Sequence, residues 1–109
     1  MKIKDLAEKL DLKVLTRADE DREITGCYSG DLLSWVMSRA KAGDVWLTVM
    51  GNINAVAVAA LHDIGCMVIC QNSQINEDAL NKAKEEGIWV FSTPLSVFEA
   101  SGRYFEAIK

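Results

Sequence analysis

The chain is 109 residues long, with 50% of its residues hydrophobic and 26% charged, which is the composition of a globular domain rather than of a disordered segment. Its net charge of −4, with lysines and arginines scattered along the chain, argues against nucleic-acid binding. The longest uninterrupted apolar run, residues 55–61, is far shorter than the ~20 residues of a membrane span. We therefore expect a single domain over residues 1–109, with no nucleic-acid partner and no membrane segment.

The first part of the chain predicts one short helix and then two short strands. Ile3, Leu6, Ala7 and Leu10 are spaced as one face of a helix over residues 2–10. A strand at 13–16, a charged and solvated turn at 17–23 and a second strand at 24–29 are expected to follow.

A second helix is expected after Asp31, because aspartate is a favoured N-cap residue. Gly43 stands where a helix often ends in a left-handed residue. The side chains expected to point inward from this helix are Leu32, Leu33, Val36, Met37 and Ala40.

The stretch from Val45 to Cys70 is typical of one complete strand–helix–strand unit. An apolar strand at 45–49 leads through a turn at 50–54 into a nearly all-apolar helix that Gly65 ends, and residues 66–70 form another buried strand. Such crossovers join neighbouring strands of a parallel sheet.

The rest of the chain predicts a helix, a strand and a last helix. Asn76 is expected to cap the first helix and Gly87 to end it, and residues 88–91 form the strand. The last helix, after the turn at 92–94, has Leu95, Phe98, Gly102 and Phe105 on one apolar face. Strands that alternate with helices predict a layered α/β fold, with a mainly parallel sheet of about five strands flanked by helices.

From Thr48 onward the chain has a recognisable pattern of small and apolar residues. The stretches that form it are Gly51-Asn52, Ala60-Leu61, residues 64–69, residues 85–88 and Ser92-Thr93-Pro94 with Phe98. This pattern resembles the DRTGG domain family, which includes the N-terminal, non-kinase domain of HPr kinase/phosphorylase and similar modules in phosphotransacetylases and CBS-domain pyrophosphatases. One departure lies at the turn after the central strand, where many members have Gly-Asp-Arg and this chain has Gly51-Asn52-Ile53.

The resemblance implies a regulatory or interaction module that is often dimeric, and a gene context beside iron-only hydrogenase subunits. It does not imply a kinase, because no glycine precedes the Lys-Ser/Thr pair that a phosphate-binding loop requires.

The best site candidates are Gly51, Asn52 and Asn54, because a helix N-terminus with asparagine side chains can bind an anion or a nucleotide phosphate. A simple N-cap with a turn glycine is the alternative. In a parallel sheet, Ser92 and Thr93 would line the same carboxyl edge, as would the clusters at 71–73 and 29–31.

No metal or cofactor is expected. Cys66 and Cys70 lie roughly 13 Å apart if they are on one strand, which is too far for two ligands of one zinc ion. Together with Cys27 they give three cysteines, and this number fits buried structural thiols in the cytoplasm better than a disulfide framework. His62, the one histidine, is read as a boundary or interface residue rather than as a catalytic base.

These observations predict a non-enzymatic regulatory or protein-interaction module in the cytoplasm. We expect a homodimer, because small domains often bury surplus apolar surface against a symmetric partner. The alternative is a sensor that binds a nucleotide or another anion at the carboxyl edge of the sheet, at Gly51–Asn54 and Ser92–Thr93.

Overall fold

A computed structural model describes residues 1–109, and its helices and strands follow the predicted order. One helix and two strands come first, and helices then alternate with strands to the end of the chain. The elements are α1 (Ile3–Lys9), β1 (Lys13–Thr16), β2 (Cys27–Ser29), α2 (Leu33–Arg39), β3 (Val45–Thr48), α3 (Ile53–Leu61), β4 (Cys66–Ile69), α4 (Glu77–Glu86), β5 (Trp89–Ser92) and α5 (Val97–Ala107).

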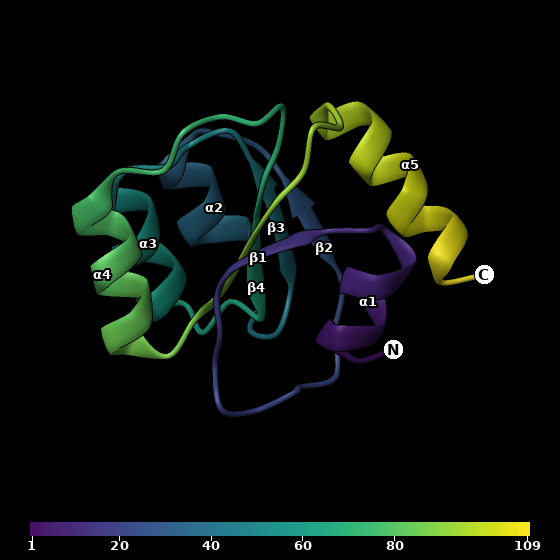
Figure 1. The fold of residues 1–109 in the computed structure, drawn as a ribbon, viewed down its shortest axis with the longest axis horizontal. Coiled ribbons are helices and arrows are strands. Elements are labelled where there is room, and N and C mark those ends of the chain that lie inside the picture. The colour runs from purple at the N-terminus through teal and green to yellow at the C-terminus, as the bar shows by residue number, and fades with distance from the viewer.

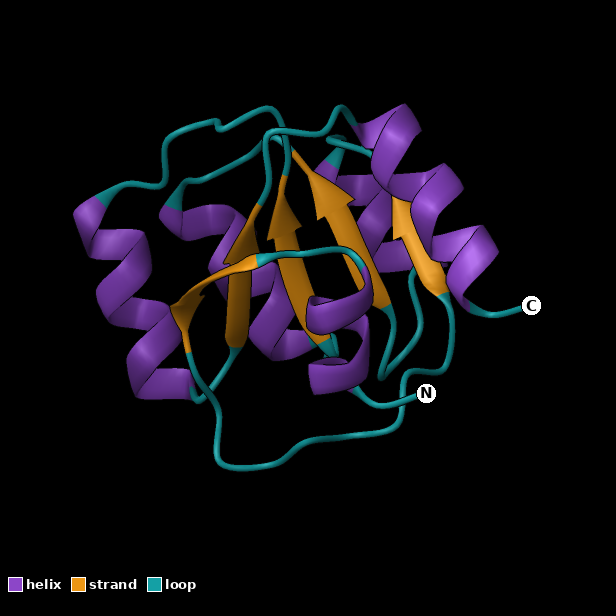
Figure 2. Cartoon of the chain, turned by 45° about the vertical axis from the view of Figure 1, so that its right-hand side comes forward, coloured by secondary structure: helices purple, strands orange, loops and turns teal.

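The strands form one five-stranded sheet in the order β1-β5-β4-β3-β2. Strands β2 to β5 run parallel to their neighbours, as the arrows in Figure 2 show, and β1 pairs antiparallel with β5 at one edge. The predicted layered α/β fold with a mainly parallel sheet is therefore confirmed.

Helices cover both faces of the sheet, with α2, α3 and α4 on one face and α1 and α5 on the other (Figure 1). Because side chains alternate along a strand, each central strand contributes to both cores. Trp46 and Met67 pack in the core under α2, α3 and α4, whereas Leu47 and Val68 pack in the core under α1 and α5. None of the helices is long and apolar enough to cross a bilayer.

Local signals explain where two of the helices begin and end. The side-chain oxygen of Asn52 accepts a hydrogen bond from the backbone N–H of Ala55 at 2.9 Å and so caps α3. Gly87 ends α4 in the left-handed conformation with φ 65°, as the sequence predicts. Asn76 occupies the N-cap position of α4, but its side chain makes no capping hydrogen bond.

The start of α2 differs from the prediction. Leu32, not Asp31, is the N-cap residue, and the Asp31 side chain binds the end of β3 instead. Val36 is the buried side chain of this helix, whereas Leu32 and Met37, both expected to point inward, are 58% and 44% exposed.

The apolar face expected for the last helix lies toward solvent. Leu95 precedes α5, which Ser96 caps, and the side chains buried against the sheet are Ala100 and Tyr104. Phe98 and Phe105 share the expected face and are exposed.

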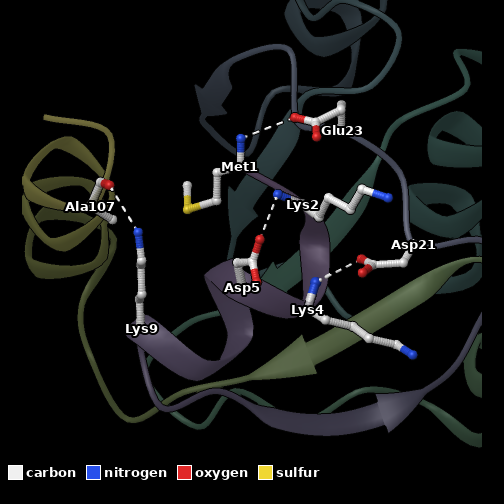
Figure 3. Close-up of polar contacts among 8 residues, drawn as sticks. All are labelled: Met1, Lys2, Lys4, Asp5, Lys9, Asp21, Glu23 and Ala107. Carbon is white, nitrogen blue, oxygen red and sulfur yellow. Dashed lines mark hydrogen bonds and ion pairs between the residues drawn. The ribbon is translucent and has the colours of Figure 1, made fainter.

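The segment before β2 is attached to the start of the chain, as Figure 3 shows. The amino group of Met1 lies 3.0 Å from a carboxylate oxygen of Glu23, and the backbone N–H of Lys4 donates to Asp21 at 2.9 Å. Asp21 is therefore half-buried, although the sequence suggests that the whole charged turn is solvated.

Candidate functional site

Four loops follow the parallel strands at the carboxyl edge of the sheet, where open α/β folds usually bind ligands. These loops carry Gly51, Asn52 and Thr93 of the suggested site, while Ser92 is the last residue of β5 and Asn54 lies in the first turn of α3. The four loops are residues 30–32, 49–52, 70–76 and 93–96.

The first two loops are joined through Asp31. Its Oδ1 accepts a hydrogen bond from the hydroxyl of Thr48 at 2.6 Å and another from the backbone N–H of Val49 at 3.0 Å. Thr48 is fully buried, so this carboxylate satisfies a polar group inside the sheet. Asp31 therefore has a structural role at the edge.

Gly51 lies against the backbone of the loop at 70–76. A Cβ atom at Gly51 would be 2.2 Å from the carbonyl oxygen of Gln74 and 2.6 Å from Cα of Ile75. The carbonyl of Gly51 also accepts a hydrogen bond from the N–H of Asn76 at 2.8 Å. This close approach explains the glycine without a ligand.

The loop at 70–76 also binds the loop that contains Thr93. The backbone N–H of Asn72 donates to the carbonyl of Thr93 at 3.0 Å, and the N–H of Gln71 donates to the carbonyl of Leu95 at 2.8 Å. Thr93 is buried, and its hydroxyl accepts from the N–H of Leu95 at 3.2 Å. Gln71 and Asn72 both adopt positive φ, at 58° and 51°.

The predicted site is therefore divided. Gly51, Asn52 and Asn54 lie on one side of the loop at 70–76, and Ser92 and Thr93 lie on the other side. All five residues reach the carboxyl edge, but the loop hydrogen-bonds to both groups and lies between them.

The N-terminus of α3 has free N–H donors at this edge, as do the N-termini of α2, α4 and α5. The side-chain oxygen of Asn52 accepts from the N–H of Ala55, and the backbone carbonyl of Asn52 accepts from the N–H of Val56 at 3.3 Å. The backbone N–H groups of Ile53 and Asn54 make no hydrogen bond, and the Asn54 side chain is exposed and unpaired. Two amides at the positive end of a helix dipole can hold an anionic oxygen.

A cavity of about 380 Å³ lies at the opposite, amino edge of the sheet. It is bounded by the segment before β2, by the C-terminal ends of α3 and α4 and by Trp89. Arg22 spans its rim and makes two hydrogen bonds to the Asp63 carboxylate, at 2.8 and 3.0 Å. Sequence reasoning missed this cavity, because Arg22 and Asp63 are 41 residues apart and no local pattern links them.

The three thiols are held in their neutral form. Burial is the main cause that raises the pKa of Cys27 to about 12 and that of Cys70 to about 11, and it raises the pKa of Cys66 still further. A thiol with a raised pKa is a poor nucleophile. His62 forms the C-terminal cap of α3 and does not line the cavity.

Comparison with known proteins gives a fold match. No family model and no curated protein matches the chain. Among solved structures, the chain is similar to the CBS and DRTGG domains of the regulatory region of Clostridium perfringens pyrophosphatase, in complex with the activator diadenosine tetraphosphate. The TM-score is 0.76 at 12% identity, over 96% of this chain and 46% of that chain, so the match spans less than half of the neighbour's length. The chain therefore has a DRTGG-like fold.

Proposed function

We propose that the chain is a regulatory module of the DRTGG type, that it is not an enzyme, and that it acts as a homodimer through protein interaction. The observation that carries this proposal is the fold match over 96% of the chain to a region described as regulatory in the pyrophosphatase. The raised pKa values of the thiols agree with it, because they disfavour a cysteine nucleophile.

Size-exclusion chromatography with light scattering tests the homodimer. At tens of micromolar we expect a particle of twice the 12.0 kDa chain mass. A particle of one chain mass across this range would contradict the homodimer.

The proposed protein partner is a subunit of an iron-only hydrogenase, which the family resemblance suggests. Purified subunits are passed over the immobilised chain, and we expect one of them to bind reversibly. Absence of binding by all of them, at concentrations up to ~100 µM, would exclude this partner.

A second function, nucleotide or anion sensing at the carboxyl edge, is favoured by the free N–H groups of Ile53 and Asn54. The complex of the pyrophosphatase region with diadenosine tetraphosphate supports a nucleotide as the ligand. We expect diadenosine tetraphosphate or an adenine mononucleotide to raise the melting temperature of the chain.

Asn54→Ala is the informative variant for this test, because the Asn54 side chain is exposed and makes no hydrogen bond in the fold. Asn52→Ala would remove the cap of α3 and lower stability whether or not a ligand binds. We expect Asn54→Ala to reduce the ligand-induced shift and Asn81→Ala, an exposed control on α4, to preserve it. If no nucleotide or phosphate shifts the wild-type melting temperature, the sensor proposal fails.

A further inference from the structure

The outer face of α5 carries an apolar stripe that no part of the chain covers. Phe98 is 87% exposed and Phe105 is 62% exposed, and Gly102 lies between them with its surface open. At 3.6 residues per turn these three positions fall within about 60° around the helix axis. We call Phe98, Gly102 and Phe105 the α5 stripe.

The packing of α5 on the sheet does not need the stripe. Ala100 and Tyr104 are the buried residues of the helix, and Val97 and Ala107 pack beside them. These inward residues lie on the side of the helix opposite the stripe. Two phenylalanines are thus left in water by a fold whose core is already complete.

Gly102 adds an independent argument. Glycine inside a helix is unfavourable relative to alanine, and it is usually retained where the backbone needs a special conformation or a close neighbour. Gly102 has neither within this chain, because a Cβ atom there would meet nothing within 4 Å. A close neighbour from outside the chain would account for it.

We propose that the α5 stripe is the contact surface between two copies of this chain, with the two α5 helices packed antiparallel about a two-fold axis beside Gly102. This inference rests on the homodimer proposed above and assigns its interface.

The stripe is complementary to itself under this symmetry. Phe98 lies one turn before the axis and Phe105 one turn after it, so Phe98 of each copy packs on Phe105 of the other. The glycine at the crossing lets the two backbones approach closely.

The two exposed rings can form the centre of a dimer interface but not the whole of it. With 87% of Phe98 and 62% of Phe105 exposed, and 150–250 Å² typical of an aromatic side chain, the two rings offer roughly 300 Å² per copy. A stable interface buries about 800 Å² per partner, of which the central part is apolar and rich in aromatic residues. The stripe therefore supplies the apolar centre, and the surface around it supplies the larger part of the area.

Light scattering on Phe98→Glu/Phe105→Glu, with Leu61→Glu as control, tests the proposal. Leu61 is 75% exposed and lies on α3, on the other face of the sheet. We expect the double variant to raise the dimer dissociation constant at least ~100-fold, as loss of a hot spot does, and the control to leave it unchanged. Circular dichroism should show the native fold for both, because all three side chains are exposed.

The possible outcomes distinguish failure of the proposed interface from failure of the proposed homodimer. If wild type and the double variant are both dimers, the stripe is not the interface and the homodimer stands. If the wild type is a monomer, both proposals fail, and a different protein or segment covers the stripe.

Gly102→Cys provides a positive test of the geometry. Cα atoms closer than about 7 Å allow a disulfide, so mild oxidation should link two copies of this variant through the crossing point. Met37→Cys, exposed on α2, should not form a linked dimer under the same conditions. Equal linking of both variants would overturn the proposed crossing.

Discussion

The hydroxyl of Thr48 donates a hydrogen bond to Oδ1 of Asp31 at 2.6 Å, and this contact joins the loop after β2 to the end of β3. The same oxygen accepts from the N–H of Val49 at 3.0 Å, so one carboxylate fixes a side chain and a backbone group. The carboxyl edge of the sheet is therefore held in shape by residues that could otherwise have served a ligand.

Replacement of Thr48 by valine should show how much this contact stabilises the fold. Valine has nearly the same shape but cannot donate, and we expect the free energy of unfolding to fall by about 1–2 kcal/mol. Urea titration measures the loss. Asp31→Asn keeps an acceptor oxygen and should lose less; an equal or larger loss in that variant would show that the negative charge, rather than the hydrogen bond, is what matters.

Gly51→Ala should be strongly unfavourable. The added Cβ would lie 2.2 Å from the carbonyl oxygen of Gln74, and backbone atoms cannot move aside as a flexible side chain can. We expect a loss of about 1–3 kcal/mol or more in the free energy of unfolding, measured by urea titration. A variant as stable as wild type would mean that the loop at 70–76 moves freely.

Gly102→Ala should raise the free energy of unfolding, whereas Gly51→Ala should lower it. The two glycines therefore serve as a matched pair. No atom of the chain opposes a Cβ at Gly102, and alanine favours the helix by about 0.5–1 kcal/mol. The measurement belongs in the Phe98→Glu/Phe105→Glu background, where dimerisation does not contribute. Destabilisation in that background would show that Gly102 has a role within a single chain.

The thiols should react only when the protein unfolds. Burial raises the pKa of Cys27 to about 12 and that of Cys70 to about 11, so neither is ionised at pH 8. We expect all three cysteines to react with a thiol reagent in denaturant and to react at least ~100-fold more slowly in the native state. Rapid labelling of one thiol in the native protein would contradict its burial.

The same shifts predict a loss of stability at alkaline pH. In the unfolded chain these thiols ionise near pH 8.5, whereas in the folded chain they stay protonated to about pH 11 or 12. The unfolded state therefore releases protons first, and the free energy of unfolding should fall as the pH rises above about 9. Urea titrations at pH 8 and pH 10, on wild type and on Cys27→Ala, measure the effect. If the free energy of unfolding falls by the same amount in both proteins, groups other than Cys27 cause the loss.

Glu99 should make the free energy of unfolding fall at acidic pH, whereas the thiols make it fall at alkaline pH. Its carboxylate accepts from the backbone N–H of Ser96 at 3.1 Å, and this bond is the main cause that lowers the pKa of Glu99, with the Ser96 side chain as the second cause. The stabilisation is present above the ordinary pKa of glutamate and is lost as the pH falls through the lowered value. NMR titration of the Glu99 carboxyl measures it. Ser96→Ala removes the side-chain contribution and keeps the backbone N–H donor, so we expect the pKa of Glu99 to rise only part of the way toward its ordinary value. A full return to the ordinary value would show that the backbone hydrogen bond does not contribute.

The sequence predicts the order of elements and the parallel sheet because apolar strands and helix-ending residues are local signals. Asn52 and Gly87 are found in this way, and the structure confirms both positions. The contacts that shape the carboxyl edge were not predictable, since Gly51 meets Gln74 only after the crossover from β3 through α3 to β4 is complete.

The sequence predicts helix α5 and its apolar face, but not the surroundings of that face. Helical spacing identifies Phe98, Gly102 and Phe105 as one apolar face, but it does not say what that face contacts. The small residue Ala100 packs on the sheet, and a count of hydrophobic side chains gives it little weight. The largest apolar stripe of a helix is thus a guide to a contact surface and not necessarily to the core of its own chain.

The antiparallel pairing of β1 with β5 has a consequence for how the protein folds. Val14 lies opposite Phe91, so strand β1 is synthesised early but can pair only after β5, near the end of the chain, has been made. Closing so long a loop is slow, and until then the apolar side chains of α1 have no sheet to cover. During translation the parallel core should therefore assemble from β2 onward, with the N-terminal segment added last, and the nascent chain should be most vulnerable to aggregation and proteolysis at its N-terminal end.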